Sequence, residues 1–319
     1  MSAQNTRVVP VNDETIAEAA ELIRAGLPVA VPTETVYGLA ADATNPEAVA
    51  RIFEAKGRPA VNPLIVHVRD IDQAATLGVC VEEEARYLAK CYWPGPLTLV
   101  LPVNPFSTLP RSARAGLDTV GLRAPAHPAI RALLEATGLP LAAPSANASG
   151  RLSPTRADHV LASLAGKIAL ILDGGETAHG IESTIVKLRG NRLTLLRPGP
   201  IDFDGLAMHA KLAVDTAWDG RIEAPGQLAS HYAPSKPVRL DALEARSGEW
   251  LIGFGPVAGD DNLSPSGDPE EAAARLFEAL HRAEREDRPG IAVAPIPDEG
   301  IGLAVNDRLR RAAAPRGES

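Results

Sequence analysis

Two short segments of the chain carry side chains suited to binding a polyphosphate, and the first holds Lys56 and Arg58 on either side of Gly57. In an extended backbone, residues two apart project to the same side, so both positive heads could converge on one anion. A guanidinium binds phosphate through two parallel hydrogen bonds, whereas a lysine ammonium acts as a mobile point charge. The alternative is a solvated helix end, where cations are favourable near the C-terminal dipole.

The second segment, residues 143–150, collects small hydroxyl and amide side chains directly after an apolar run. Ser145 and Asn147 share one side if the backbone is extended, and small neighbours let a ligand approach the main chain. An ordinary Asx or Ser turn before the next helix explains the same residues. Neither GxxxxGK[ST] nor GxGxxG occurs in the chain, so a nucleotide site would have to be built from such cations and neutral donors.

Further polar residues stand at the ends of apolar runs or inside them, and each has a structural alternative. Arg123 and Arg197 precede proline-containing turns that orient a guanidinium for an anion, but either could equally be a surface ion-pair partner. Ser183 begins a β-branched strand and could offer its hydroxyl to a ligand, although such residues are also simply favoured in strands. His67 lies inside the apolar run 64–68, where a buried imidazole must find a partner.

The remaining residues suggest no acid/base pair, nucleophilic triad or zinc site. Glu34 and Asp42 lack a second carboxylate at helix-face spacing, and no GxSxG elbow surrounds Ser145. Cys80 and Cys91 are the two cysteines, and they form neither a CxxC motif nor a Cys/His cluster. We therefore assign no general base and no structural metal from the sequence.

The overall composition excludes several classes of protein. With 319 residues, 45% of them apolar, the chain can bury a sizeable core, and its length suggests two domains. The formal net charge of −8 gives no global positive field for nucleic acid, so any RNA contact would have to be local. No segment reaches the roughly 20 apolar residues of a membrane span, and the N-terminus lacks a signal-peptide pattern. We expect a soluble cytoplasmic protein.

Helices and strands of mixed order must position these side chains. After a leading strand, the patterns predict helices within 12–26, 45–56, 81–90, 128–137 and 156–164, the last capped by Thr155. They predict strands over 27–31, 63–68, 97–101, 119–122, 139–143, 168–172, 183–188 and 192–196. This mixture favours an α/β or α+β sheet covered by helices.

A change of composition separates the last part of the chain. Residues 215–237 contain turn formers without sustained periodicity and are interpreted as a linker. Beyond them, strands over 238–240, 250–254 and 291–294 alternate with a helix opened by Asp268 and with a final helix. The sequence thus predicts a domain over 1–214, a linker or lid over 215–237, and a small α/β domain over 238–319.

Taken together and in this order, these segments closely resemble the YrdC-type L-threonylcarbamoyl-adenylate synthase family, in its long form with an added C-terminal domain. The matching segments are VPTETVYGLAADA, KGRPAVNPLIVHV, WPGPLTLVL, TVGLRAP, APSANASGRLSPT, ESTIV, LLRPGPI, PGQLASHYAPSKP and NDRLRRAA. The pairs Lys56/Arg58 and Ser145/Asn147 look like the KxR and SxN motifs of that family. The resemblance covers nearly the whole chain and implies a YrdC-like twisted mixed sheet flanked by helices, followed by a small Rossmann-like α/β domain.

The resemblance also implies a nucleotidyltransferase reaction in two steps. L-threonine and bicarbonate give N-carboxy-threonine, whose carboxylate attacks the α-phosphorus of ATP and yields L-threonylcarbamoyl-AMP and pyrophosphate. A downstream threonylcarbamoyl transferase complex then modifies a tRNA adenosine beside the anticodon, so contact with tRNA is indirect. Displacement at phosphorus depends on positioning and charge neutralisation, which suits a site without a triad. Mg2+ would be carried with ATP, with no protein-bound metal site.

The family's site residues can be transferred to matching positions of this sequence. Its ATP contacts fall on Arg58, Asn62, Thr119, Ser145, Ser153 and Arg197, with Lys56 and Asn147 completing the paired motifs as catalytic residues. Its threonine contacts fall on Thr35, His67, Arg123, Ser183 and the backbone of Ala143. Tyr232 of the linker would join the ATP site at its mouth and exclude water from a carbamate and a mixed anhydride. One departure is Ala224, which stands where the family has a serine before PGQ.

Two other functions account for parts of the pattern. An RNA-binding module without catalysis would show steep salt dependence and release no pyrophosphate, and the negative net charge argues against it. A carbamoyl-transfer component using another carbamoyl source is the third possibility, because related domains occur inside larger carbamoyltransferases. Those proteins carry additional metal or hydrolase modules, and none is detectable in this sequence.

Overall fold

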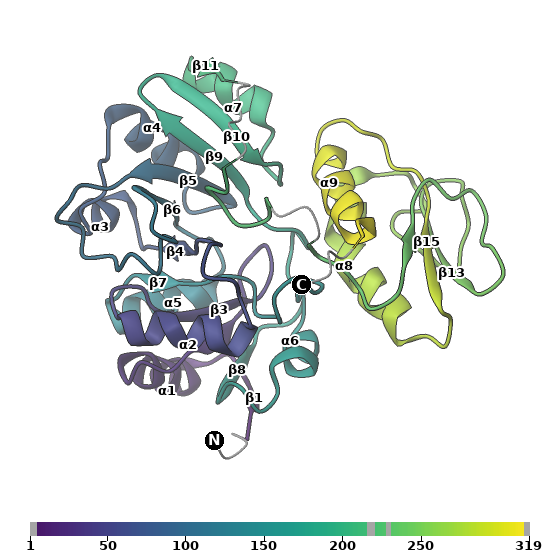
Figure 1. The fold of residues 1–319 in the computed structure, drawn as a ribbon, viewed down its shortest axis with the longest axis horizontal. Helices are drawn as coiled ribbons and strands as arrows, with labels where there is room; N and C mark the ends of the chain where they lie inside the picture. Colours follow the sequence, from purple (N-terminus) through teal and green to yellow (C-terminus); the bar gives the residue numbers. More distant parts are fainter. Residues whose placement is uncertain (1–4, 216–220, 228–230, 316–319) are drawn as a thin grey trace.

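The computed structural model of the chain describes residues 5–215, 221–227 and 231–315, and it contains two sheets (Figure 1). The larger sheet has 11 strands in the order β1 (Arg7–Pro10), β8 (Leu170–Asp173), β2 (Val29–Val31), β3 (Gly38–Asp42), β7 (Leu141–Ala142), β4 (Ile65–His67), β6 (Thr119–Arg123), β5 (Leu97–Pro102), β9 (Thr184–Arg189), β10 (Arg192–Arg197) and β11 (Ala213–Val214). Parallel pairs such as β4 with β6 alternate with antiparallel pairs such as β5 with β6. The predicted mixed sheet is confirmed.

Helices cover this sheet, and their ends follow local sequence signals. They are α1 (Asp13–Arg24), α2 (Pro46–Lys56), α3 (Ile71–Thr76), α4 (Glu83–Tyr92), α5 (Pro128–Thr137), α6 (Ala157–Leu164) and α7 (Phe203–Ala210). The side chain of Asn45 accepts hydrogen bonds from the backbone N–H groups of Glu47 and Ala48, which caps α2. Gly138 ends α5 in the left-handed conformation at φ 69°.

Several elements differ from the sequence prediction. Helix α6 has Arg156 at its N-cap without a side-chain cap bond, so the predicted Thr155 cap is wrong. Thr155 instead places its Oγ1 3.4 Å from Nδ1 of His159. Strand β3 was not predicted because it follows a polar run, and α3 was not predicted because six residues show little periodicity. Strand β7 is shorter than predicted and ends before Pro144, which has no N–H to donate.

The two faces of the large sheet pack into separate hydrophobic cores. Along β2, Val29 and Val31 pack with α1 and α5, whereas Ala30 between them belongs to the core beneath α2, α4 and α6. This alternation follows from the two-residue period of a strand. Because both faces are covered, the strands read as nearly continuous apolar runs. The sheet thereby provides a rigid frame for the loops at its strand ends.

The C-terminal part forms a parallel four-stranded sheet in the order β12 (Val238–Arg239), β15 (Gly290–Val293), β13 (Glu249–Gly253) and β14 (Asp261–Asn262). Helices α8 (Pro269–Arg285) and α9 (Gly302–Ala313) pack on it and lie on the side that faces the large sheet (Figure 1). The predicted small α/β unit is therefore present, although β14 was not predicted. No strand is shared between the two sheets of the described residues, and the proposed domain bounds stay a prediction. Within the described residues, no helix has the length and apolar character needed to cross a membrane.

Helices α8 and α9 dock the C-terminal unit onto the larger one through polar contacts. His281 of α8 stacks on His159 of α6, with ring centroids 3.8 Å apart, and its Nε2 lies 3.1 Å from the backbone oxygen of Ser153. On α9, the fully buried Arg308 lies 3.0 Å from Glu182. The interface thus reaches residues close to the predicted ATP contacts.

A glycine in this interface allows α8 to approach closely. Gly180 has φ +65°, and a Cβ atom there would lie 2.1 Å from the carbonyl oxygen of Ala274 in α8. We expect Gly180→Ala to lower the free energy of unfolding by more than about 2 kcal/mol, because a left-handed alanine alone costs about 1–2 kcal/mol. Thermal unfolding measures the loss. Gly166→Ala is the matched control, since Gly166 has φ +78° and open space around it; an equal loss in both variants would contradict the steric explanation.

Candidate active site

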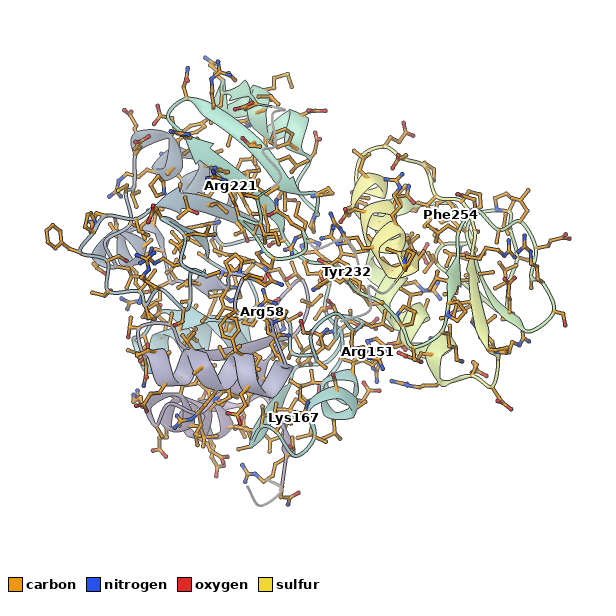
Figure 2. The ribbon with its side chains drawn as sticks, in the orientation of Figure 1. Arg58, Arg151, Lys167, Arg221, Tyr232 and Phe254 are labelled. Carbon is orange, nitrogen blue, oxygen red and sulfur yellow. The ribbon has the colours of Figure 1, made fainter. Side chains whose placement is uncertain are left out.

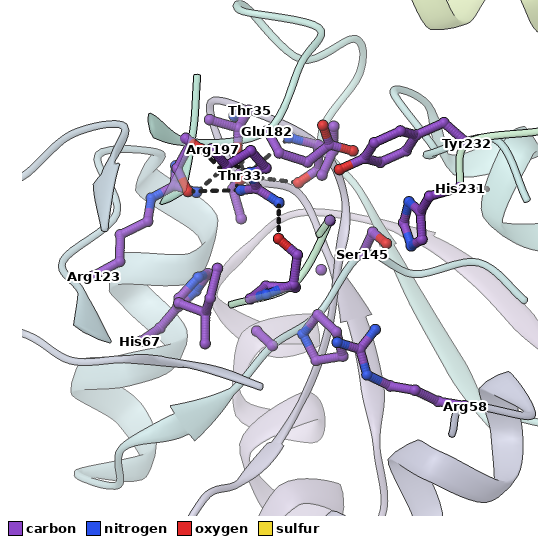
Figure 3. A pocket seen from close by; sticks show the side chains of 18 residues that line it. Thr33, Thr35, Arg58, His67, Arg123, Ser145, Glu182, Arg197, His231 and Tyr232 are labelled. Carbon is purple, nitrogen blue, oxygen red and sulfur yellow. Dashed lines mark hydrogen bonds between the residues drawn. The ribbon is translucent and has the colours of Figure 1, made fainter. Parts of the chain in front are cut away.

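A cavity opens where loops at the ends of several strands of the large sheet meet the linker (Figure 3). Parallel strands β4 and β6 end there with His67 and Arg123, which are paired in register. Ligands of open α/β sheets bind outside such carboxyl ends. The lining residues are Thr33, Thr35, Val36, Gly38, Arg58, Ile65, His67, Arg123, Ala143, Pro144, Ser145, Glu182, Ser183, Arg197, Pro225, Gly226, His231 and Tyr232.

Most residues predicted from the sequence line this one cavity, although they come from distant segments. They are Thr35, Arg58, His67, Arg123, Ala143, Ser145, Ser183, Arg197 and Tyr232. The sheet brings these segments together because β4, β6, β7 and β9 are close in its strand order. A cavity lined by several cations and small hydroxyls can bind anions without a protein nucleophile.

Four predicted residues do not line the cavity themselves but hydrogen-bond to residues that do or to the loop that carries them. Lys56 donates from Nζ to the backbone oxygen of Ser145 at 2.5 Å, and Asn147 accepts from the same Nζ. Asn62 accepts from Arg58 through its side chain at 2.7 Å, while Ser153 donates its hydroxyl to Glu182. These four residues hold the lining groups in place.

Thr119 is the one predicted ATP contact that the structure places apart from the cavity. It begins β6 and pairs with Pro102, whereas the cavity lies at the opposite end of the strand, beside Arg123. Thr119 lies four positions before Arg123 along the strand, which corresponds to about 13 Å. Contact of Thr119 with ATP stays a prediction.

The expected convergence of Lys56 and Arg58 on one side of an extended backbone is wrong. Lys56 is the last residue of α2, and Gly57 follows in the left-handed conformation at φ 59°. The ammonium of Lys56 is therefore buried under the 145–147 loop, where Ser145 O, Asn147 O and Asn147 Oδ1 surround it. Burial, and then the neighbouring charge of Arg58, lowers the pKa of Lys56 well below its usual range. In this structure Lys56 positions the loop instead of presenting its charge to the cavity.

Arg58 does present a guanidinium to the cavity, and its orientation is fixed by its own loop. Its Nε donates to Asn62 O at 3.1 Å, and its Nη2 donates to Asn62 Oδ1 at 2.7 Å and to Pro63 O at 2.8 Å. Burial lowers the pKa of Arg58 to about 10, so the group keeps its charge at neutral pH. A guanidinium held through Nε and Nη2 leaves Nη1 for a ligand oxygen.

Arg123 forms the second cationic subsite, together with a carboxylate that sequence reasoning did not assign. Its Nη2 lies 2.6 Å from Glu34, its Nη1 donates to Thr35 Oγ1 at 2.8 Å, and its Nε donates to Gly95 O at 3.1 Å. Burial alone would raise the pKa of Glu34, but the charge and hydrogen bonding of Arg123 hold it at about 2. Two of the five N–H donors of Arg123 remain for a carboxylate ligand.

His67 lies in the same subsite as a neutral imidazole. Burial, reinforced by the positive charge of Arg123, lowers its pKa to about 3. Its Nδ1 is buried and has no hydrogen-bond partner within the described part of the chain. A buried ring nitrogen without a partner in a cavity suits a hydrogen bond to a ligand. His67 thus lines the cavity together with Arg123, and its contact with threonine stays a prediction.

The depressed pKa of His67 predicts a pH dependence of stability. In the unfolded chain His67 has its ordinary pKa of 6.5, whereas in the folded state its pKa is about 3. As the pH falls below 6.5, the unfolded chain therefore binds a proton that the folded chain does not bind, and unfolding becomes more favourable. His231 has the same sign, because burial also lowers its pKa to about 3. We expect urea unfolding to show falling stability from pH 6.5 to 4.5, and a flatter curve for His67→Gln. A variant curve parallel to that of the unchanged protein would contradict this assignment.

Ser183 and Arg197 form the side of the cavity nearest β9 and β10. Arg197 donates to the backbone oxygen of Ser183 from Nε at 3.1 Å and from Nη2 at 2.9 Å, and Nη2 also lies 3.1 Å from Ser183 Oγ. The hydroxyls of Ser183 and Thr98 are 2.7 Å apart. These bonds hold Ser183, which directly precedes β9, at the wall of the cavity.

Glu182 connects the cavity to the C-terminal unit and was not identified as a site residue from the sequence. It accepts from the Ser153 hydroxyl and from Arg308 Nε, while Arg308 also lies 5.6 Å from the Tyr232 ring. Burial would raise the pKa of Glu182, but Arg308 and then Arg197 lower it. Both residues lie in segments that match the compared family, Glu182 in ESTIV and Arg308 in NDRLRRAA. Nothing local in either segment shows that the two side chains pair.

The linker closes the cavity from the side of the C-terminal helices, with Tyr232 between the two units (Figure 2). Gly226 passes so close that a Cβ would lie 2.7 Å from Tyr232 Oη and 2.9 Å from Arg197 Cδ. The free space left is about 50 Å³, which is room for a few water molecules. A ligand larger than this space would require the lining to move.

Ala224 packs where the compared family has a serine. Its side chain is 1% exposed and lies in an apolar cluster with Ile65, Val100, Ile185 and Leu196. A serine hydroxyl among these aliphatic groups would need a partner, so alanine suits this packing. Residues 228–230 of the predicted lid lie outside the described residues.

The cavity offers few ligands for a resident metal ion. Glu182 lines the cavity and is paired with Arg308, and Glu34, which is not among the lining residues, is paired with Arg123. Over residues 5–215, 221–227 and 231–315, no group of three or more His, Cys, Asp or Glu side chains is placed to hold an ion. A metal that enters with a polyphosphate remains a prediction.

Comparison with known proteins finds matches over most of the chain. Residues 21–199 match the Sua5/YciO/YrdC family model, described as "Telomere recombination", and residues 206–314 match the model "Threonylcarbamoyl-AMP synthase, C-terminal domain". The chain is 42% identical to the threonylcarbamoyl-AMP synthase of Bacillus subtilis, with 96% of this chain and 94% of that protein covered. It is 43% identical to the threonylcarbamoyl-AMP synthase of Pyrococcus abyssi, covering 93% and 94%. The crystal structure of P. abyssi Sua5 complexed with L-threonine superposes with a TM-score of 0.86 at 40% identity, covering 97% of each chain.

Proposed function

The chain belongs to the Sua5/YciO/YrdC family in its long form, and on that basis we propose that it synthesises L-threonylcarbamoyl-AMP and pyrophosphate from L-threonine, bicarbonate and ATP. One observation supports this proposal above the others. Two separate cationic subsites, one around Arg58 and Arg197 and one around Arg123, face a single cavity. An acyl-adenylate synthase needs such a pair, because it must hold a triphosphate and an amino-acid carboxylate at the same time.

In the proposed reaction, Arg123 holds the carboxylate of threonine through its free N–H donors. His67, Thr35, Ser183 and the backbone of Ala143 surround the rest of the amino acid. A structure of a relative complexed with L-threonine supports this choice of substrate. Glu34 keeps Arg123 charged and fixed, because its own pKa is too low for it to take up a proton near pH 7.

The nucleotide subsite lies toward Arg58, Ser145 and Arg197. The carbamate oxygen of N-carboxy-threonine attacks the α-phosphorus, the bond from that phosphorus to the bridging oxygen breaks, and pyrophosphate leaves. Arg58 and Arg197 stabilise the charge that develops on the phosphate oxygens, and the Ser145 loop is held by Lys56. Mg2+ carried with ATP would supply further charge neutralisation in this site. Tyr232 excludes water once the linker has closed over both substrates.

We further propose that the product serves a downstream threonylcarbamoyl transferase complex acting on tRNA in the cytoplasm. A mixed anhydride decomposes in water, so a closed cavity and a nearby acceptor are both useful. Among the described residues, no helix is long and apolar enough to cross a membrane.

Omission of each substrate tests the proposed function. Purified protein is incubated with ATP, Mg2+, threonine and bicarbonate, and pyrophosphate is measured with each component left out in turn. We expect pyrophosphate only when all are present, together with a product of the mass of threonylcarbamoyl-AMP. Unchanged pyrophosphate without threonine would reject the synthase. Retention of RNA without any pyrophosphate would instead identify a binding module, and product formed only with another carbamoyl donor would identify a carbamoyl-transfer component.

A further inference from the structure

We propose a second ligand site, for a nucleotide phosphate, in a groove beside α3 that is separate from the catalytic cavity. The groove measures about 360 Å³ and shares no lining residue with that cavity. Its cations are Arg69, Arg86, Lys90 and Arg131, and its aromatic residue is Trp93. This volume lies in the range of small-molecule sites.

The cations of the groove are only partly neutralised. Arg86 pairs with Asp72 at 2.7 Å, and Arg69 lies a loose 3.6 Å from Glu135. Lys90 and Arg131 have no carboxylate within 4.0 Å among the residues with defined structure. The groove also contains Asp70, but Asp70 is occupied as the N-cap of α3, where it accepts from Gln73. Four cations against the carboxylates of Asp70, Asp72 and Glu135 leave a local net charge of +1 on a chain whose net charge is −8.

Arg69 is held only loosely at the groove. Its side chain is 39% exposed, and its Nη1 lies 3.6 Å from Glu135, beyond hydrogen-bond distance. The guanidinium can therefore exchange this contact for a hydrogen bond to an anion in the groove.

Trp93 indicates which kind of anion the groove would bind. Its Nε1 donates to Leu97 O at 2.7 Å and its ring packs partly against the core, so the part that lines the groove, and not the N–H, can contact a ligand. Stacking on an indole suits a planar base, and the surrounding cations suit the phosphate attached to it. An acidic peptide offers only the negative charge. A nucleotide, free or within single-stranded RNA, uses both features.

The position of the groove brings its occupant close to the catalytic cavity. Arg69 follows His67 by two residues, and Ala124 of the groove directly follows Arg123. The backbone oxygen of Ala124 accepts from Gly95, whose own oxygen accepts from Arg123. An occupant of the groove would therefore contact the segment that fixes Arg123.

Equilibrium binding to the full chain tests the proposal. AMP, inorganic phosphate, adenosine and a ten-nucleotide single-stranded RNA are titrated at low ionic strength while indole fluorescence is recorded. We expect AMP to quench the fluorescence of Trp93, phosphate to compete with it, and adenosine to bind far more weakly. Trp93→Phe should lose the quench. Stronger binding of the RNA than of AMP, with a steeper salt dependence, would identify single-stranded RNA as the ligand of the groove. Equal binding of the two would identify a free nucleotide.

Charge variants separate this groove from the catalytic cavity. Lys90→Ala/Arg131→Ala should weaken AMP binding in the fluorescence assay at least about tenfold, because charge-assisted hydrogen bonds are lost, and should still form pyrophosphate. Lys167→Ala/Arg192→Ala is the matched control, since both residues are exposed and the charge change is the same. Unchanged AMP affinity in the groove variant would overturn the proposal. So would tighter binding of hexaglutamate than of AMP, because the groove would then be a surface for an acidic protein.

Discussion

Alanine at Arg58 should lower kcat/KM for pyrophosphate formation by about 100- to 1,000-fold, the loss found when a preorganised donor to transition-state charge is removed. The guanidinium of Arg58 is fixed by Asn62 and Pro63, so it meets the phosphate without reorganising. Arg58→Lys should recover little activity, because an ammonium lacks the planar fork that reaches two acceptors. Pyrophosphate release under saturating threonine and bicarbonate measures the effect.

Alanine at Lys56 should reduce activity by a similar factor, but through the 145–147 loop. Removing the ammonium leaves Ser145 O, Asn147 O and Asn147 Oδ1 without their donor, and these atoms shape the segment that presents Ser145. We therefore expect lower stability as well as lower activity. Arg58→Ala should also lose some stability, because Asn62 O, Asn62 Oδ1 and Pro63 O lose their donor. Lys167→Ala, on the exposed surface, is the control and should retain both. Near-normal turnover in the Lys56 and Arg58 variants would reject their proposed roles.

Local signals in the sequence were sufficient where a few neighbouring residues determine the backbone. The side-chain cap and first-turn proline of α2, at Asn45 and Pro46, and the glycine that ends α5 are of this kind. The predicted Thr155 cap failed because His159, four residues further on, competes for the same side chain. Strand β3 escaped prediction because its identity depends on pairing with β2 and β7, which no local pattern shows.

The site was predictable as a set of residues and not as a geometry. The resemblance identified Arg58, Arg123 and Ser183, and the structure places all three on one cavity. The spacing of Lys56 and Arg58 gave the wrong direction for the Lys56 side chain, because the left-handed Gly57 turns the backbone between them. Glu182 and Arg308 are 126 residues apart, so only the packing of α9 against the large unit shows that they form a pair.

Removal of Arg308 should have a large effect on stability and on the site together. Arg308 is 0% exposed and Glu182 is 6% exposed, so either charge left alone would be buried without compensation. Breaking a buried pair in this way costs about 3–5 kcal/mol. Besides Glu182, Arg308 binds Pro198 O at 2.6 Å, which adds an unsatisfied acceptor to the loss. Urea unfolding of Arg308→Leu measures the decrease.

A double-mutant cycle distinguishes a buried lone charge from a simple loss of packing. Arg308→Leu/Glu182→Gln removes both charges, so it should be more stable than Arg308→Leu alone, because the desolvated carboxylate is gone. Arg310→Ala, in the same helix, removes an exposed pair with Asp298 and should cost no more than about 1 kcal/mol. Because Glu182 also accepts from Ser153, restored stability in the double variant should come without restored activity. Full activity in Arg308→Leu would mean that α9 does not influence the catalytic cavity through Glu182.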